Sequence, residues 1–235
     1  MTLAHKKSIF VELGKFLSQF SEVENTKCQT VLHNDLYFDK FIDLIQLSPS
    51  HNGWYTNENV YFAIQSWAEA LTEENLNQWL NRYNLDNVTS KIVGLVLAGN
   101  IPLVGFHDFI SVLLSGHKVV VKTSSNDQHL LPFIAKYLIS VDPELENYIT
   151  FVEGKLENFD AVIATGSNNT IGQFKNYFSN YPCLFRKNRT SLAVIKGDES
   201  DEDLKKLGSD IFNYFGLGCR SRFRGNDGLC HQSSS

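Results

Sequence analysis

The stretch "KIVGLVLAGNIP" at residues 91–102 decides the fold. After Lys91 it is apolar and rich in branched side chains as far as Ala98, which is typical of a strand buried on both faces of a parallel sheet. Gly, Asn and Pro then follow, and these residues favour a turn. The stretch therefore predicts an inner strand whose carboxyl end opens into a loop.

Downstream of this strand, strand patterns alternate with helical ones. Further strands are expected at "KVVVK" (118–122), "YITFVEG" (148–154), "DAVIATG" (160–166) and "SLAVIKG" (191–197). Apolar residues at helical spacing predict helices at about 104–114, 128–139 and 170–178. Strands that alternate with helices form βαβ units, so we expect an α/β fold with a doubly wound, mostly parallel sheet.

Upstream, the first ninety residues are helical in pattern. Helices are expected at about 8–20, 36–45 and 58–71, and Thr72 can cap a fourth that runs to Tyr83. A turn is expected at "SPSHNGWY" (48–55). Near the other end, the acidic stretch 198–216 predicts a helix with carboxylates at its N-terminus, ending at Gly216 beside Cys219.

Composition narrows the class of protein. The chain has 235 residues, 43% of them apolar, and a net charge of −5, so it can bury a core but offers no basic stripe for nucleic acid or an anionic membrane. No signal peptide or membrane span is evident, and we expect a soluble cytoplasmic protein.

The four cysteines lack zinc-site spacing, and no metal is expected; Cys28 and Cys183 are interpreted as buried small apolar residues.

Ligands of open α/β sheets bind beyond the carboxyl ends of the strands, so the residues there are candidates. They are Asn100 in "GNIP", Lys122 after three valines, and Thr165, Gly166 and Ser167, which end a strand and open a helix. A helix N-terminus suits a phosphate, and an ammonium suits a ribose or phosphate oxygen. No GxGxxG motif is present, and each residue also fits an ordinary strand end or turn.

The combination of these positions with the Gly-flanked cysteine of "GLGC" (216–219) indicates a protein family more specifically than any one of them does. In this order and spacing the sequence resembles the aldehyde dehydrogenase superfamily, and most closely its acyl-CoA reductase branch, the LuxC-like fatty-acid reductases. The resemblance is carried by "NGWYTNENVYFAIQSWAEAL" (52–71), "LAGNIPLVGFHDFISVLLSGHKVVVKTSSND" (97–127) and "ATGSNNT" (164–170), and it extends to about Ser221.

The resemblance implies roles for individual residues. Cys219 matches the nucleophile and Asn100 the asparagine that helps to hold the oxyanion. The cofactor-binding residues that it implies are Lys122, Ser124, Ser125, Thr165, Gly166 and Ser167. The reaction implied is the reduction of a fatty acyl thioester, either acyl-CoA or acyl-carrier protein, to the aldehyde through an acyl-enzyme on Cys219.

Two departures from the superfamily pattern refine this expectation. In "RKNRTSLAVI" (186–195), Arg186 stands at about the place where hydrolytic relatives have the glutamate that activates water. Without that base, the acyl group can persist until hydride reduces it. Ser125 stands where NAD-preferring relatives often have a glutamate that would repel a 2′-phosphate, which favours NADPH as cofactor.

The expected organisation is a helical N-terminal segment (1–90), a dinucleotide-binding domain (91–198), the start of a catalytic domain (199–221) and an unrelated or disordered tail (222–235). We interpret "RFRGNDGLCHQSSS" (222–235) as a divergent end after truncation, and a full-length protein as a possible homo-oligomer. Two alternatives stay open: an inactive cofactor-binding remnant that acts as a nucleotide- or partner-binding module, and a Rossmann-like protein unrelated to thioesters.

Overall fold

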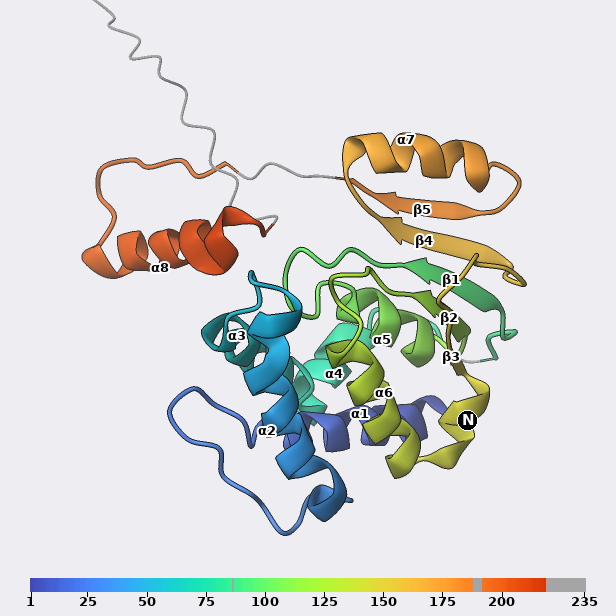
Figure 1. The fold of residues 1–235 in the computed structure, drawn as a ribbon, viewed down its shortest axis with the longest axis horizontal. Helices are drawn as coiled ribbons and strands as arrows, with labels where there is room; N and C mark the ends of the chain where they lie inside the picture. The colour runs from blue at the N-terminus through green and yellow to red at the C-terminus, as the bar shows by residue number, and fades with distance from the viewer. Residues whose placement is uncertain (86, 188–191, 219–235) are drawn as a thin grey trace, which may run out of the picture. The chain divides into compact units, whose positions relative to one another are not determined.

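The computed structural model describes residues 1–85, 87–187 and 192–218, which fall into two compact units, Met1–Lys187 and Asn188–Ser235. In the first unit the described residues form a parallel five-stranded sheet of order β3-β2-β1-β4-β5 (Figure 1). Its strands are β1 (Ile92–Val96), β2 (Lys118–Lys122), β3 (Ile149–Phe151), β4 (Ala161–Thr165) and β5 (Cys183–Arg186). The predicted doubly wound α/β fold is confirmed.

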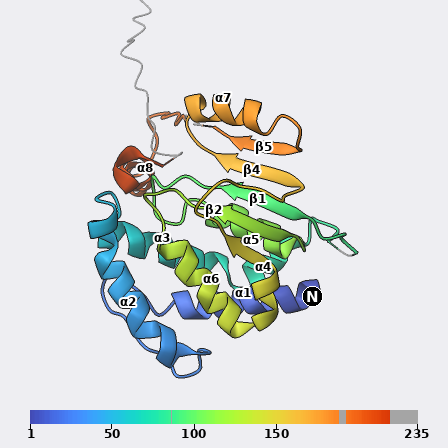
Figure 2. The same cartoon turned by 45° about the vertical axis from the view of Figure 1, so that its right-hand side comes forward.

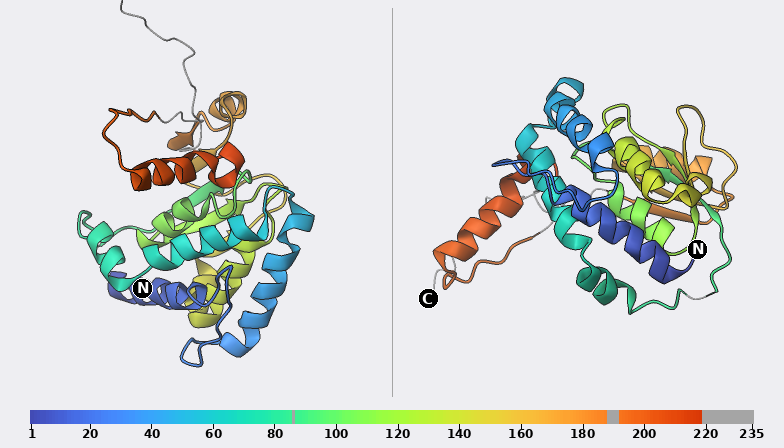
Figure 3. Two further views of the ribbon diagram at one scale, coloured as in Figure 1. Left: turned by 90° about the vertical axis from the view of Figure 1, so that its left-hand side faces the viewer. Right: turned by 90° about the horizontal axis from the view of Figure 1, so that it is seen from below.

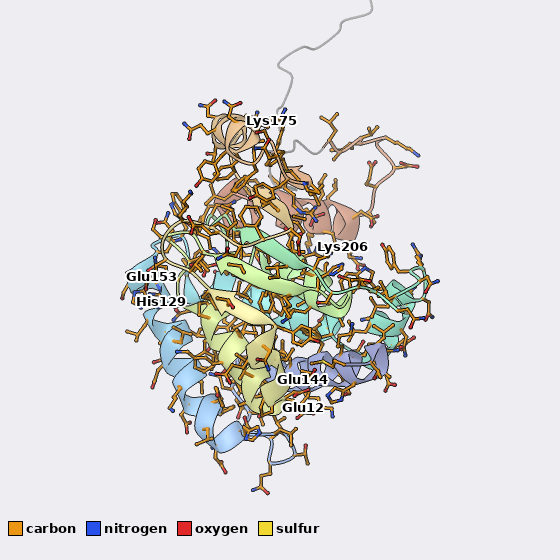
Figure 4. All side chains as sticks on the ribbon, turned by 90° about the vertical axis from the view of Figure 1, so that its right-hand side faces the viewer. Glu12, His129, Glu144, Glu153, Lys175 and Lys206 are labelled. Atoms are coloured by element: carbon orange, nitrogen blue, oxygen red, sulfur yellow. The ribbon has the colours of Figure 1, made fainter. Side chains whose placement is uncertain are left out.

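Helices cover both faces of this sheet. The helices of the first unit are α1 (Leu3–Leu17), α2 (Asn34–His51), α3 (Asn57–Ala70), α4 (Glu73–Leu80), α5 (Phe106–Leu114), α6 (Leu130–Val141), the 3-10 helix η1 (Pro143–Asn147) and α7 (Asn168–Tyr177). Helix α7 covers one face beside β4 and β5, while α5 and α6 cover the other, with α1 behind them (Figures 1 and 2). In Figure 4, Lys175 of α7 and Glu12 of α1 lie at opposite ends, with the sheet between them.

The larger hydrophobic core lies between the sheet and the N-terminal helices; in the left view of Figure 3, the dark blue helix α1 lies at the bottom of this unit. Val119 and Val121 point into this core, as the alternation of a strand requires. Phe16 of α1 stacks on Tyr137 of α6 with ring centroids 4.1 Å apart. The N-terminal helices and the sheet therefore share one core.

A side chain of another helix also holds the C-terminal end of α5 in place. The buried Lys6 side chain of α1 donates through Nζ to the Leu114 carbonyl at the end of α5, at 2.9 Å. A cation at a helix C-terminus is favourable, because it meets the unpaired carbonyls of the last turn. Burial lowers the pKa of Lys6.

The last predicted strand is wrong. The described part of "SLAVIKG", residues 192–197, forms no strand, and Leu192 and Val194 are 83% and 84% exposed. The fifth strand is instead β5, which pairs with β4 from Val162↔Cys183 to Thr165↔Arg186. Apolar character alone does not make a strand, because a strand also needs a neighbour for its backbone hydrogen bonds.

The expected turn at 48–55 begins later than predicted. Helix α2 continues through Pro49 to His51, and the Asn52 N–H still donates to the Ser48 carbonyl at 3.0 Å. The helical hydrogen bonding resumes after the proline, so the chain leaves the helix only at Asn52. The other predicted helices of this unit are confirmed within a few residues of their expected ends, and Thr72 caps α4.

The second unit contains the predicted acidic helix. Helix α8 (Asp201–Phe212) begins with a capping box between Ser200 and Asp203, and the 3-10 helix η2 (Asn213–Gly216) follows it. Its first turn holds three carboxylates, which favour the positive end of the helix dipole. Across the residues that the structure describes, no helix is both long and apolar enough to cross a membrane.

Candidate active site at the carboxyl edge of the sheet

The strand order reverses at β1. The chain runs from β1 to β2 and β3 on one side of the sheet, and then returns to β4 on the other side of β1. The loops after β1 and β4 therefore diverge at this point, where open α/β sheets bind their ligands. The candidate residues predicted from sequence, Cys219 apart, come from the loops and strand ends at this edge.

Lys122 is the last residue of β2. The sheet register pairs it with Val96 of β1, which is paired in turn with Ala164, so these side chains share the face that α7 covers. The Lys122 Nζ donates to the Gly154 carbonyl, in the loop after β3, at 2.7 Å. An ammonium group has three donors, so this bond orients Lys122 and leaves it able to donate to an anion.

Thr165, Gly166 and Ser167 lead from β4 into α7. Ser167 caps the helix, since its Oγ accepts from the Thr170 N–H at 3.2 Å. A Cβ on Gly166 would lie 3.1 Å from Thr170 Cγ2, so a larger residue would crowd this turn. The first N–H groups of α7 have no intrahelical acceptor, which is the arrangement that binds phosphate oxygens at helix N-termini.

Ser124 and Ser125 lie in the loop after β2. Ser124 Oγ accepts from the Asn126 N–H at 3.3 Å, and Ser125 is exposed. A Cβ on Gly99, in the loop after β1, would lie only 2.8 Å from Ser124 Cβ. The two loops are therefore packed as closely as a glycine permits.

Asn100 follows Gly99 and is exposed in the loop after β1. The structure thus brings the Asn100 loop, Lys122, the serine loop and the Thr165–Ser167 turn to one edge of the sheet. Cys219, the predicted nucleophile, lies outside the described residues.

An ion pair between a buried carboxylate and a partly exposed arginine at this edge was missed from the sequence. Arg186, the last residue of β5, donates from Nε to Asp108 Oδ1 and Oδ2 at 2.9 and 3.0 Å, and from Nη2 to Oδ1 at 2.7 Å. Arg186 is paired with Thr165, whereas Phe185 shares the α7 face with Ala164, so Arg186 lies on the face opposite Lys122. The signal available was Asp108 itself, a single carboxylate within the apolar helix "FHDFISVLL".

The ion pair controls the charge of Asp108, whose side chain is 5% exposed. Burial alone would raise the pKa of this carboxyl, but the His107 ring and the Arg186 guanidinium hold it below its usual value. Asp108 therefore stays ionised at neutral pH. Because it lies in the first turn of α5, it fixes the start of that helix to the end of β5.

The interpretation of Cys28 and Cys183 as buried residues is wrong, because both are exposed. The Cys28 thiol lies 3.1 Å from the Thr30 hydroxyl, and this hydrogen bond lowers the pKa of the thiol. Cys183 donates to the Tyr181 carbonyl at 2.9 Å, and partial burial raises its pKa. Cys28 sits in an irregular loop and Cys183 on an edge strand, so neither has the surroundings that bury a side chain on all sides.

Comparison with solved structures defines the class of fold. The chain is similar to aldehyde dehydrogenase 21 from Physcomitrella patens, solved with its product succinate (14% identity, TM-score 0.62, covering 93% of this chain and 47% of that one). It is also similar to an aldehyde dehydrogenase from Bacillus cereus in complex with NAD+ (16% identity, TM-score 0.59, 94% and 46%). A benzaldehyde dehydrogenase from Corynebacterium glutamicum matches at 13% identity, with a TM-score of 0.58 and coverage of 90% and 47%. The chain thus has an aldehyde dehydrogenase-like fold and spans about half the length of these structures.

Residues 65–222 match the LuxC family of acyl-CoA reductases, and this range is more than half of the chain. The chain belongs to that family. No curated protein matches it.

Proposed function

We propose that this chain carries the cofactor-binding and acyl-transfer residues of an NADPH-dependent reductase of fatty acyl thioesters. The observation that carries the proposal is the LuxC match over residues 65–222, which contains Cys219 and all the candidate residues at the carboxyl edge of the sheet. The proposed substrate is an acyl-CoA or an acyl-carrier thioester, and the product is the aldehyde.

In this proposal the Cys219 thiolate attacks the thioester carbonyl, and the carrier leaves as a thiol with the proton that Cys219 gave up. Asn100 donates to the oxygen on which negative charge develops, and one such donor is typically worth about 2.7–4 kcal/mol of barrier. When bound, NADPH supplies the hydride that reduces the Cys219 thioester. The thiohemiacetal oxyanion on Cys219 then expels the thiolate and releases the aldehyde.

Arg186 supports reduction over hydrolysis. A guanidinium is always protonated in proteins and cannot accept a proton from water. The three hydrogen bonds to Asp108 also hold it in one orientation. With a fixed cation where hydrolytic relatives place a base, water is not activated and the acyl-enzyme can wait for reduction.

The donors at the carboxyl edge fit a dinucleotide. Lys122 and the α7 N-terminus offer a cation and backbone N–H groups for ribose and diphosphate oxygens. A Cβ on Gly166 would crowd the Thr170 side chain, so glycine lets this turn pack against the first turn of α7. We propose that Ser124 and Ser125 contribute hydroxyl donors on the ribose side.

Replacing Ser125 with glutamate tests the choice of cofactor. We expect Ser125→Glu to weaken NADPH binding by roughly tenfold, because a carboxylate would repel the 2′-phosphate, while NADH binding stays the same. Fluorescence titration of both cofactors measures this, and Ser125→Gln is the uncharged control of equal size. Equal losses for NADPH and NADH would show that Ser125 does not face the 2′-phosphate.

The distribution of the candidate residues over the two units favours a second function. In this function the chain binds the cofactor but does not catalyse the reaction. Every candidate cofactor residue lies in Met1–Lys187, whereas Cys219 belongs to Asn188–Ser235. The first unit has its own core, so cofactor binding does not require the second unit to complete that core.

Turnover separates the two functions. The chain is incubated with NADPH and a long-chain acyl-CoA, and aldehyde formation is measured together with NADPH oxidation. Aldehyde that depends on Cys219 establishes the reductase. NADPH binding without aldehyde establishes the module, and no binding at all contradicts both.

A further inference from the structure

Three buried residues lie behind the loops that carry the candidate site. They are Asn52 and Tyr55, in the connection between α2 and α3, and Asp127, in the loop after β2; they are 8%, 3% and 8% exposed. The proposed chemistry uses none of them. Their contacts reach both the loop after β1, which carries Asn100, and the loop after β2, which carries Ser124 and Ser125.

Asn52 bonds to both loops with a single amide group. Its Nδ2 donates to the Gly99 carbonyl at 3.2 Å and to the Asn126 carbonyl at 3.3 Å. Its Oδ1 accepts from the Trp54 N–H at 3.0 Å, which fixes the orientation of the amide. Both Nδ2 hydrogens are therefore used, one on each loop.

Tyr55 bonds to the same β1 loop beyond Asn100. Its hydroxyl donates to the Ile101 carbonyl at 3.0 Å. Asn52 and Tyr55 thus bond to the residues on either side of Asn100, so the backbone of Asn100 is fixed at both ends. Burial and the negative charge of Asp127 raise the pKa of Tyr55, which keeps the hydroxyl protonated as a donor.

Asp127 completes the group from the other loop. Its N–H donates to the Ser124 carbonyl at 3.0 Å and closes the turn that holds Ser125. A Cβ on Gly99 would lie 3.1 Å from Asp127 Cβ, so this turn touches the β1 loop directly. Asp127 Oδ1 is buried without a hydrogen-bond partner among the described residues; burial raises the pKa of this carboxyl to about 6, although the interaction with the Tyr55 hydroxyl lowers it.

We infer that Asn52, Tyr55 and Asp127 form a positioning unit that holds the Asn100 loop and the Ser124–Ser125 loop at a fixed separation. The unit touches neither substrate nor cofactor; it acts through the two loops. The consequence of this arrangement rests on the proposed function: oxyanion stabilisation and cofactor binding then depend on the same buried hydrogen bonds.

Amide hydrogen exchange of the 235-residue chain tests the positioning unit directly and without cofactor. We expect Asn52→Ala to speed exchange roughly tenfold in both 99–103 and 123–127, because each loop loses a buried hydrogen bond. Tyr55→Phe should speed exchange in 99–103 more than in 123–127, since its hydroxyl donates to the Ile101 carbonyl and reaches the other loop only through the Asp127 side chain. The control is Ser48→Ala, which removes a nearby buried hydroxyl that bonds within α2 to the Leu44 carbonyl at 2.9 Å.

Helix α6 serves as the internal reference. If Asn52→Ala speeds exchange in α6 as much as in the loops, the residue is merely structural and the inference is wrong. It is also wrong if only one loop responds to Asn52→Ala, or if Tyr55→Phe affects both loops equally.

NADPH affinity is the second measurement. We expect a several-fold loss in Asn52→Ala and no loss in Ser48→Ala. Exchange that changes as expected in a chain that never binds NADPH would contradict the proposed function and uphold the positioning unit. Wild-type affinity retained by Asn52→Ala would contradict the coupling to cofactor binding.

Discussion

Cys219→Ala is expected to lower the rate of acylation by a long-chain acyl-CoA by roughly a thousandfold or more, because a missing nucleophile has effects of this size or larger in acyl transfer. The reason is chemical: a thiolate is a far better nucleophile than the un-ionised serine and threonine hydroxyls at the carboxyl edge. Mass spectrometry of the intact chain, followed by peptide mapping, measures the adduct.

The other cysteines decide how this experiment is designed. Cys28 is exposed and its pKa is lowered by the Thr30 hydrogen bond, so a general alkylating reagent would label it as well. Acyl transfer is therefore the better probe, and the background in which Cys219 is tested combines Cys28→Ser, Cys183→Ser and Cys230→Ser. Acylation that persists in Cys219→Ala, or that maps to Cys28 in the wild type, would contradict the assignment.

The sequence predicts the inner strands well for a physical reason. Residues Lys118–Lys122 form a strand at the predicted bounds, because three consecutive valines favour a strand and both faces of an inner strand are covered. The edge strand β5 gives no such signal: "CLFR" is four residues long, and Leu184 is 49% exposed. Residues 192–197, which follow β5, are more apolar but have no partner strand among the described residues. The apolar pattern alone therefore led to a wrong prediction of the last strand.

In the candidate site, too, the sequence predicts some features and misses others. Asn100, Lys122 and Thr165 could be grouped from sequence, because the carboxyl ends of parallel strands meet at one edge of a sheet. The partnership of Asp108 with Arg186 spans 78 positions and depends on which strand lies at the edge, and that strand was misplaced. The bonds of Asn52 to two loops could not be foreseen either, since they depend on how the α2–α3 connection packs. The role of Cys219 stays a prediction.

Arg186→Ala is expected to destabilise the first unit by about 3 kcal/mol at neutral pH. Removing one partner of a buried ion pair leaves the other charge unpaired, which costs about 3–5 kcal/mol when both are buried. The lower value applies because the Arg186 side chain is 37% exposed, and because the His107 ring still lies 3.8 Å from Asp108 Oδ1 after the change. Urea unfolding measures the loss, and Lys155→Ala is the control, since it removes an exposed cation that pairs with Glu157 and lies over the Tyr177 ring, where water screens the charges.

The pH dependence identifies Asp108 as the cause of that loss. Its pKa is lowered in the folded chain, so the pair stabilises the fold above the ordinary carboxyl pKa, and this contribution disappears as pH falls through the lowered value. In Arg186→Ala, Asp108 loses the guanidinium and keeps only the His107 ring, so its pKa rises and the destabilisation should shrink in acid as Asp108 takes up a proton. Asp108→Asn combined with Arg186→Ala should recover part of the stability at neutral pH, because no buried charge is then left unpaired. A loss in Arg186→Ala no larger than in Lys155→Ala, or one that does not change with pH, would show that the pair does not fix the start of α5 to the end of β5.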